Sequence, residues 1–173
     1  MLTGARVTAP DGFEQFQKGV NWHFIGNATK SHRALLVCFE WSGKGQPTSY
    51  IHVMDRQKFE AALDAKKLVV SDGIELPPWL MSREGVNFAT IETDRAGRKR
   101  TYRDIVEARY KYIKPALDNL EEILSARDVA AAINSWAKRS SPRQNETRFR
   151  LWFLSYGCFS PASVGPLLCR CPA

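Results

Sequence analysis

The pattern of hydrophobic and polar positions divides the chain into a strand-like first part and a helical last part. Three short runs in the first part are rich in β-branched and aromatic residues and are bounded by turn residues, which is typical of strands. They span residues 21–25, 33–41 and 48–54. The last two runs are joined by a short polar segment in which Gly43 and Gly45 can supply positive φ, so we expect them to form an antiparallel hairpin.

A short helix is predicted directly after this hairpin, over residues 56–66. Asp55 is placed to cap it, because its carboxylate can accept hydrogen bonds from the free amide groups of the first turn. Phe59, Ala62 and Leu63 recur at helical spacing and give the helix an apolar side. A returning strand is expected at 68–70.

Helical spacing of apolar residues begins at Thr101. The first helix of this part contains Pro115, which should kink or divide it, because proline lacks the amide hydrogen and its ring crowds the preceding turn. Asp128 is expected to cap a second helix that runs to about Lys138.

A polar segment, 140–144, separates the second helix from a third. Either Asn145 or Thr147 can cap this third helix, which is expected to run to about Phe159. Its expected buried side consists of Phe149, Trp152, Phe153 and Tyr156.

These elements predict an α+β protein with two domains. Residues 1–76 are expected to form a small β-rich domain, a twisted sheet or partial barrel with one helix against it. The stretch 77–97 begins with two prolines, which suit neither a helix interior nor a central strand, and is interpreted as a linker. Residues 98–160 are expected to form a basic three-helix domain with a helix-turn-helix, and 161–173 an irregular tail.

Charge supports this division. The formal charge is +7 at neutral pH, yet residues 1–93 carry ten cationic and ten acidic side chains. Residues 94–150 carry fourteen cationic and eight acidic side chains, and 151–173 add one arginine. Because the excess positive charge lies in one stretch, the pattern indicates a polyanion-binding module attached to a neutral one.

A helix-turn-helix formed by the second and third helices would bind duplex DNA. Three helices are the smallest all-helical unit that can hold one helix out towards the major groove. Outward side chains near the start of the third helix would reach base edges, where arginine can pair with guanine and asparagine with adenine. The predicted base-reading residues are Asn145, Thr147, Arg148 and Arg150.

Other cations are placed for contacts with the DNA backbone, where phosphate neutralisation supplies affinity. The predicted backbone-contacting residues are Lys138, Arg139 and Arg143 beside the turn, and Arg98, Lys99, Arg100 and Arg103 at the entrance to the first helix. The pattern leaves two alternatives open, a solvated basic bundle that binds nothing and a protein-docking domain.

Three strings in the helical part resemble the N-terminal DNA-binding region of TnsB-like transposases, in the Mu and retroviral-integrase superfamily. They are 103–115 (RDIVEARYKYIKP), 128–136 (DVAAAINSW) and 145–156 (NETRFRLWFLSY). In that family an Arg, Tyr and Ile-x-Pro pattern leads into a recognition helix with a Thr-x-(aromatic or Val)-x-x-(Trp or Leu) core. The matching positions here are Arg109, Tyr112, Ile113 and Pro115, then Thr147, Phe149 and Trp152. The family also begins with a small β-rich domain, which residues 21–70 resemble in order and size.

The resemblance implies sequence-specific binding to the terminal repeats of a transposable element, with other transposase subunits as further partners. The family's chemistry resides in an RNase H-like domain with three metal-binding carboxylates, which would need on the order of 100 residues beyond the helix-turn-helix. Only 14 residues follow Phe159, so we expect a non-catalytic chain that ends by truncation or frameshift. The alternative is a truncated regulatory or protein-interaction module of a transposition system, without DNA specificity of its own.

Several classes of site are not expected. The four cysteines, at 38, 158, 169 and 171, are too few and too unevenly placed for a disulfide framework, which favours a reducing cytoplasm. The spacing of the last three matches no common zinc pattern, and the histidines are interpreted as ordinary hydrogen-bonded side chains, so neither a metal nor a cofactor is expected. No residue stands out as a catalytic nucleophile or acid-base pair. No run of about 18 apolar residues is present, so no membrane span is expected.

Aromatic residues in the first part allow two interpretations. Trp22, Phe39, Trp41 and Tyr50 are expected to alternate into the core of the sheet. The alternative is an exposed aromatic platform of the kind on which single-stranded nucleic acids stack.

Overall fold

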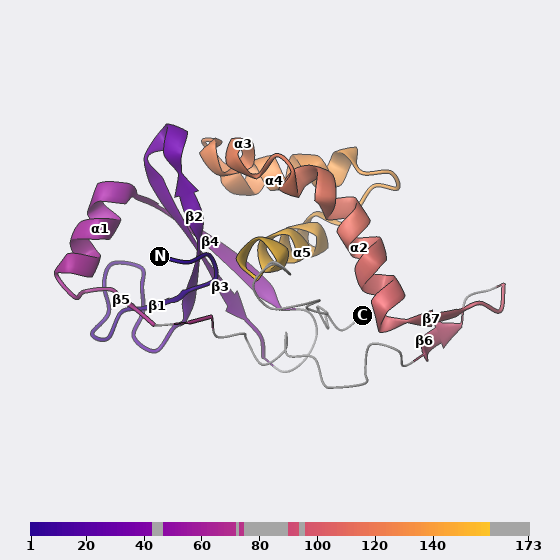
Figure 1. The fold of residues 1–173 in the computed structure, drawn as a ribbon, viewed down its shortest axis with the longest axis horizontal. Coiled ribbons are helices and arrows are strands. Elements are labelled where there is room, and N and C mark those ends of the chain that lie inside the picture. The colour runs from indigo at the N-terminus through magenta and orange to yellow at the C-terminus, as the bar shows by residue number, and fades with distance from the viewer. Residues whose placement is uncertain (43–46, 72, 75–89, 94–95, 160–173) are drawn as a thin grey trace.

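The computed structural model describes residues 1–42, 47–71, 73–74, 90–93 and 96–159. Within this part, the chain has a mixed α+β fold with a five-stranded antiparallel sheet, a separate two-stranded ribbon and five α-helices (Figure 1). The α+β class expected from the sequence is therefore confirmed. The strands of the sheet are β1 (Arg6–Thr8), β2 (Trp22–Ala28), β3 (Arg33–Glu40), β4 (Thr48–Asp55) and β5 (Val69–Val70).

The sheet has the strand order β4-β3-β2-β1-β5. The expected hairpin is confirmed as β3 and β4, which pair from Arg33 opposite Asp55 to Glu40 opposite Thr48. The segment that joins them, including the two glycines expected at positive φ, lies outside the described residues. The short strand β1 is not evident in the sequence, because three residues are too few to show an alternation.

Both faces of the sheet are buried. Along β3, Leu35 and Val37 face one hydrophobic cluster, whereas Leu36 and Cys38 face another. This is the two-residue alternation of a strand, here with apolar residues on both sides. Other elements of the fold therefore cover both faces of the sheet.

Helix α1 (Arg56–Asp64) covers the first face. The predicted cap is confirmed, because the Asp55 carboxylate accepts the backbone N–H of Lys58 at 3.0 Å. Phe59 and Ala62 are buried, as their spacing predicts, and the Phe59 ring stacks on Phe24 with 6.0 Å between centroids. These contacts hold α1 on the outer side of the sheet.

The other four helices lie on the opposite face (Figure 1). Their bounds are α2 (Tyr102–Leu117), α3 (Leu120–Ser125), α4 (Val129–Arg139) and α5 (Glu146–Cys158). The predicted caps are present: Asp128 accepts the N–H of Ala131 at 2.9 Å, and Asn145 accepts the N–H of Arg148 at 3.0 Å. Asn145, and not Thr147, is therefore the cap of α5.

Pro115 lies inside the last turn of α2. The helix continues for two residues beyond it and ends at Leu117, and α3 starts at Leu120. The predicted division is thus confirmed, displaced towards the C-terminus. The side chain of Asn119 donates a hydrogen bond to the Pro115 carbonyl at 2.8 Å and occupies an acceptor at the end of the helix.

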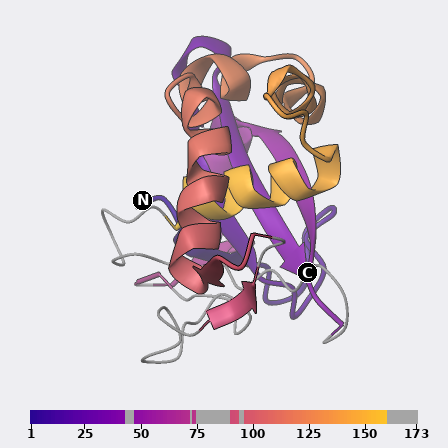
Figure 2. The same cartoon turned by 90° about the vertical axis from the view of Figure 1, so that its right-hand side faces the viewer.

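Helix α5 is the central helix of the fold. It packs against α2 and α4 on one side and against β2 and β4 on the other, and Figure 2 shows it crossing behind α2. From Leu151 to Tyr156 every residue is buried. Such all-round burial requires a helix that is apolar on all sides.

The sheet and the helices share one hydrophobic cluster. Leu35 and Val37 of β3 belong to the same cluster as Ile113 of α2 and Phe153 of α5, and all four are fully buried. The expected separation into a β-rich and a helical domain therefore stays a prediction about folding units, since described residues of both parts contribute to this one cluster.

Polar contacts also join the two parts. The Arg33 guanidinium of β3 donates to the carbonyls of Leu124 and Ala126, at 3.3 and 2.7 Å, at the end of α3. The Thr29 hydroxyl donates to the Glu121 carboxylate at 2.8 Å, and this hydrogen bond lowers the pKa of Glu121. These contacts fix α3 against the rim of the sheet.

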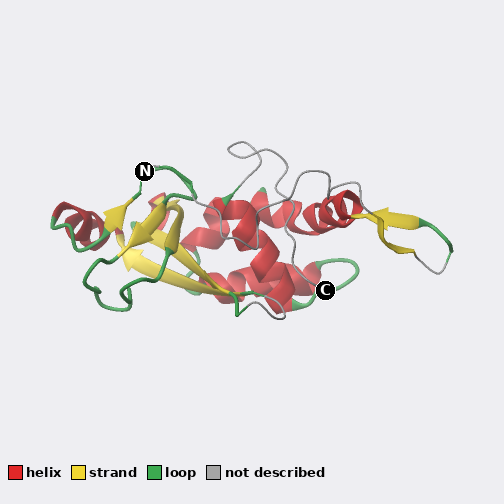
Figure 3. Ribbon diagram, turned by 90° about the horizontal axis from the view of Figure 1, so that it is seen from below, coloured by secondary structure: helices red, strands yellow, loops and turns green. Residues whose placement is uncertain are grey.

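The remaining strands, β6 (Thr90–Thr93) and β7 (Lys99–Thr101), form an antiparallel ribbon. The ribbon projects from the start of α2, away from the sheet (Figure 3). The linker expected over 77–97 and the tail expected over 161–173 fall largely or wholly outside the described residues. Within the described part of that linker, Thr90–Thr93 is a strand, which the polar composition of the segment does not predict.

The four aromatic residues near the sheet have different environments. Trp22 is buried and Phe39 is half-buried against the core, as expected. Trp41 and Tyr50 are exposed, at 41% and 50%. The expectation of four core residues is therefore wrong for these two, because Trp41 follows the end of β3 and Tyr50 lies on the edge strand β4.

Candidate nucleic-acid interface

The turn between α4 and α5 is built by hydrogen bonds to the end of α4. The backbone N–H of Gln144 donates to the Ala137 carbonyl at 3.1 Å, and the Ser140 hydroxyl donates to the Trp136 carbonyl at 3.0 Å. The side chain of Gln144 donates to the Pro142 carbonyl at 2.7 Å. These bonds give the turn a defined shape and fix where α5 begins.

The first turn of α5 is its exposed part. Thr147 and Arg148 are exposed, and Asn145 is exposed while its side-chain oxygen caps the helix. A shallow hollow of about 380 Å³ lies beside this turn. It is lined by Arg143, Gln144, Asn145, Glu146 and Thr147. Three of the four predicted base-reading residues are thus brought together on one exposed surface.

Arg150, the fourth predicted base reader, is placed differently. Its side chain is half-buried, and its Nε atom is enclosed with no hydrogen-bond partner. The prediction that the Arg150 side chain points outward is therefore wrong for its inner part, which includes Nε. The reason is that Leu151 and Leu154 are also buried, so α5 is covered on the side that the sequence pattern leaves to solvent.

Two of the predicted backbone-contacting cations flank this first turn. Lys138, at the end of α4, lies 3.5 Å from the Glu146 carboxylate, and Arg143, in the turn, lies 3.8 Å from it. Both cationic side chains remain more than half exposed, at 55% and 70%. Exposed ion pairs of this kind are weak, so both cations remain able to bind another anion.

Arg139 is exposed but lies back along its own helix. Its guanidinium donates to the Ser135 carbonyl at 3.3 Å and to the Ser135 hydroxyl at 2.9 Å. It also lies over the Trp136 ring, 4.5 Å from the ring centroid. Arg139 would have to leave these contacts before it could reach a phosphate in front of the turn.

The second group of predicted backbone-contacting cations lies at the other end of α2. Arg98 and Lys99 are exposed next to and within β7. The side chains of Arg100 and Arg103 lie outside the described part of the structure. The two groups of cations are therefore separated by the length of α2 between the ribbon and the α4–α5 turn.

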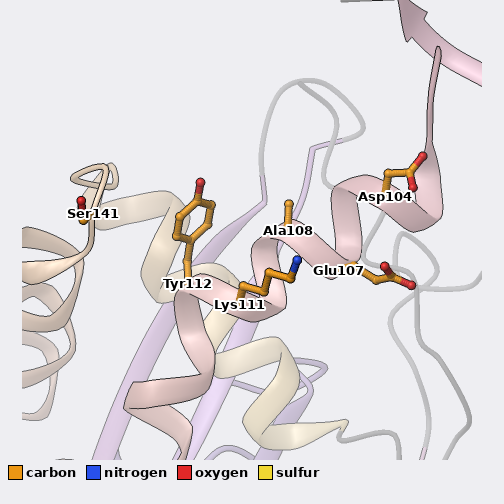
Figure 4. Close-up of a pocket in the computed structure, with 6 residues that line it drawn as sticks. All are labelled: Asp104, Glu107, Ala108, Lys111, Tyr112 and Ser141. Atoms are coloured by element: carbon orange, nitrogen blue, oxygen red, sulfur yellow. The ribbon is translucent and has the colours of Figure 1, made fainter. Parts of the chain in front are cut away.

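A second hollow, of about 580 Å³, lies between these two groups (Figure 4). It is lined by Asp104, Glu107, Ala108, Lys111 and Tyr112 of α2, and by Ser141 of the α4–α5 turn. Figure 4 shows Asp104 and Glu107 towards the ribbon and Tyr112 towards Ser141. The carboxylates make this stretch of α2 less favourable for a polyanion than either end.

The cysteines and other candidate ligands show no reactive or metal-binding arrangement within the described residues. Burial, together with the charge of Glu40, raises the pKa of the Cys38 thiol to about 11. Burial also raises the pKa of Cys158 well above its ordinary value. Among the described side chains, no three of the His, Cys, Asp and Glu residues are grouped to hold a metal ion.

None of the described helices has both the length and the apolar character needed to cross a bilayer. Comparison of the chain with protein-family models, with curated proteins and with solved structures gives no match. The function is therefore inferred from the residues of this chain alone.

Proposed function

We propose that α4, the turn after it and α5 bind duplex DNA, with the first turn of α5 at the major groove. The observation that carries this proposal is the exposed Arg148 on the first turn of α5, flanked by the exposed cations Lys138 and Arg143. Helix-turn-helix proteins contact base edges with the first residues of the second helix, while neighbouring cations neutralise phosphates. Arg148 would then contact a base edge, and Lys138 and Arg143 would contact phosphates on either side of it.

The position of Arg148 is difficult to explain by folding. It is the third residue of α5, where the helix dipole disfavours a cation. Its side chain forms no ion pair with the described residues, and only its backbone N–H takes part in capping the helix, by donating to the Asn145 side chain. A cation that weakens its own helix is well explained by an anionic ligand that it binds.

The buried length of α5 limits how it can bind. Only its first turn is exposed, because the helix is covered by the sheet and by α2 from Phe149 onwards. We therefore assign base contacts to Thr147 and Arg148, with the amide group of Asn145 as a further donor. Arg150 is better suited to supporting this surface from within than to reading bases.

The specific target is proposed from the resemblance to TnsB-like transposases. On that basis the ligand is the terminal repeat of a transposable element. The resemblance includes Thr147, Phe149 and Trp152, and in the structure the first of these is exposed while the other two are buried. Contact with DNA requires an exposed Thr147, and packing in the core requires a buried Phe149 and Trp152, as the structure has them.

Selection from a random-sequence duplex library, followed by affinity measurements on the selected duplex, tests the proposal. Arg148→Ala is expected to cost about 1–3 kcal/mol of binding free energy and to relax preference at one base pair. Arg143→Ala is the matched control, because loss of a phosphate contact weakens all duplexes alike. The proposal is contradicted if the wild-type chain selects no duplex, or if both variants weaken binding uniformly.

A second candidate is a protein-interaction module without DNA specificity. The exposed edge strand β4, with Tyr50 half exposed on it, favours this alternative, because unpaired strand edges can accept a further strand. Tyr50→Lys would weaken such an interaction and leave DNA binding unchanged. Size-exclusion chromatography of both forms, with and without DNA, distinguishes the two functions.

A further inference from the structure

We infer that the β6–β7 ribbon is a second DNA-binding element, which contacts the same duplex within about one helical turn of α5. This inference rests on the proposed function of the α4–α5 surface. It adds to that function a second structural element, the set of DNA positions that the chain should protect, and the direction of that element along the duplex.

The first support is that the described side chains of the ribbon lie outside the core. Thr93, Ala96, Arg98 and Lys99 are exposed, and Thr101, at the junction with α2, is half-buried. None of these five belongs to either hydrophobic cluster. An isolated two-stranded hairpin is marginally stable in water, so burial of these described side chains does not explain why the chain builds a ribbon here.

The second support is its charge and shape. Arg98 and Lys99 are consecutive exposed cations, and the sequence continues with Arg100 in β7. The ribbon projects clear of the sheet and of α5 (Figure 3). A two-stranded antiparallel ribbon fits the major groove, which is about 12 Å wide, and its cations can bind phosphates at the groove edges.

The third support is that the ribbon is firmly joined to the rest of the molecule. Strand β7 runs into α2 with no intervening residue. At this junction the Asp104 carboxylate accepts the backbone N–H and the hydroxyl of Thr101, each at 2.7 Å, and the N–H of Asp104 donates back to that hydroxyl at 3.3 Å. This capping box sets the direction in which the ribbon leaves the helix.

The distance along α2 places both elements on one duplex. Tyr112 and Ser141 of the α4–α5 turn lie towards one end of the hollow in Figure 4 and Asp104 towards the other. Thr101, three residues before Asp104, is the last residue of β7. Eleven residues of α-helix span about 16 Å, whereas one turn of duplex DNA is about 34 Å. The ribbon therefore begins about half a duplex turn from the α4–α5 turn, for a duplex that lies along α2.

The carboxylates between the two elements define the expected footprint. Asp104 and Glu107 are exposed on the side of α2 that lies between the ribbon and the turn, where they outnumber the one exposed cation of the hollow, Lys111. Because they repel phosphates, the duplex should contact both ends of this surface and not its middle. Two protected segments separated by an unprotected gap are expected.

Hydroxyl-radical footprinting on a 30-base-pair duplex selected from a random library, a length of about three turns, tests this inference. The wild-type chain is expected to protect an inner segment at α5 and an outer segment less than about one turn away. Arg98→Gln with Lys99→Gln should lose the outer segment alone, and should reduce the salt dependence of log K by about 1.8, the value for two phosphate contacts.

Two control variants make the outcome specific. Lys18→Gln with Lys66→Gln removes the same charge from exposed positions near α1 and should keep both segments. Arg98→Lys with Lys99→Arg keeps the charge and should keep both segments too. The inference is overturned if Arg98→Gln with Lys99→Gln retains the outer segment, or if the α1-side variant loses it. A wild-type chain that protects no segment would instead overturn the proposed function itself.

Discussion

At the scale of single residues, one glycine shows how closely the N-terminal segment approaches α5. Gly4 has a φ of +86°, and a Cβ added there would lie 2.5 Å from the Cys158 carbonyl oxygen. Gly19 has a similar φ of +80°, but no atom lies within 4 Å of an added Cβ. Substitutions at both positions would incur the cost of the left-handed backbone, and only the one at Gly4 would also incur a close contact with α5.

Gly4→Ala is expected to destabilise the protein more than Gly19→Ala. The left-handed backbone costs a non-glycine residue about 1–2 kcal/mol at either position, and only at Gly4 does the contact with α5 add to this cost. Urea unfolding of both variants measures the difference in free energy. Equal losses would show that the N-terminal segment can move away from α5 at no cost.

His52 is the residue whose ionisation should affect folding. Its half-buried ring lies 5.2 Å from the Phe16 ring and 6.0 Å from the Trp22 ring, between centroids, and contacts the Gln15 amide. Burial lowers the pKa of His52 below its ordinary value of 6.5, an effect that Glu14 opposes and Lys58 reinforces. The unfolded chain therefore takes up a proton at a higher pH than the folded chain does.

The free energy of unfolding should consequently fall as the pH drops below about 6.5, since the unfolded state binds more protons there. His52→Gln removes this contribution, so its stability should decrease less than that of the wild type between pH 7.5 and 5.5. Urea titrations at the two pH values measure the change, with His32→Gln, at an exposed position, as the control. An equal decrease in wild type and His52→Gln would contradict the assigned role of burial.

At the scale of elements, local signals predict the caps and strands well. Asp55, Asp128 and Asn145 cap the helices that they are expected to cap, because capping depends only on a short polar side chain and three adjacent residues. The β3–β4 hairpin likewise follows from two apolar runs and the turn between them. The ribbon is missed, because its polar residues carry no alternation of apolar and polar positions.

Helix α5 is more deeply buried than its sequence pattern predicts. The pattern predicts one buried side, formed by Phe149, Trp152, Phe153 and Tyr156, whereas Leu151 and Leu154 on the opposite side are also buried. The signal is present in the sequence, since apolar residues occupy all sides of this helix and indicate a fully enclosed one. Which elements enclose it depends on tertiary packing, which the local pattern does not contain.

Leu154→Ala tests this burial directly. Leu154 is fully buried on the side left to solvent by the sequence pattern, and truncation of such a side chain costs about 2–5 kcal/mol. Thr147→Ala, on the exposed first turn of the same helix, should change stability by less than about 0.5 kcal/mol. Chemical denaturation measures both values. A Leu154→Ala cost as small as that of Thr147→Ala would mean that α5 is not enclosed.

At the scale of the whole molecule, the described residues place α1 on one face of the sheet and α2–α5 on the other, with α5 between the sheet and α2 (Figures 1 and 2). The shared cluster around Leu35, Val37 and Phe153 joins the sheet to the helices. The charge distribution still differs between the two parts, as the sequence indicates. The division into two domains that this charge distribution suggests therefore stays a prediction.

One cooperative unfolding transition is expected from this shared core. The helical signal in far-ultraviolet circular dichroism and the fluorescence of the tryptophans, which include Trp22 beside β1 and Trp152 in α5, should change at the same urea concentration. Two separate transitions would instead support independent β-rich and helical domains, as the sequence pattern predicts.

The salt dependence of DNA affinity tests the central claim, that the cations around α5 and on the ribbon bind one duplex. Fluorescence anisotropy of the wild-type chain on its selected duplex, between 50 and 200 mM salt, is the measurement. Four phosphate contacts, by Lys138, Arg143, Arg98 and Lys99, predict a slope of log K against log salt of about −3.6. Affinity that does not change with salt, or no measurable affinity at the lowest salt, would contradict the account.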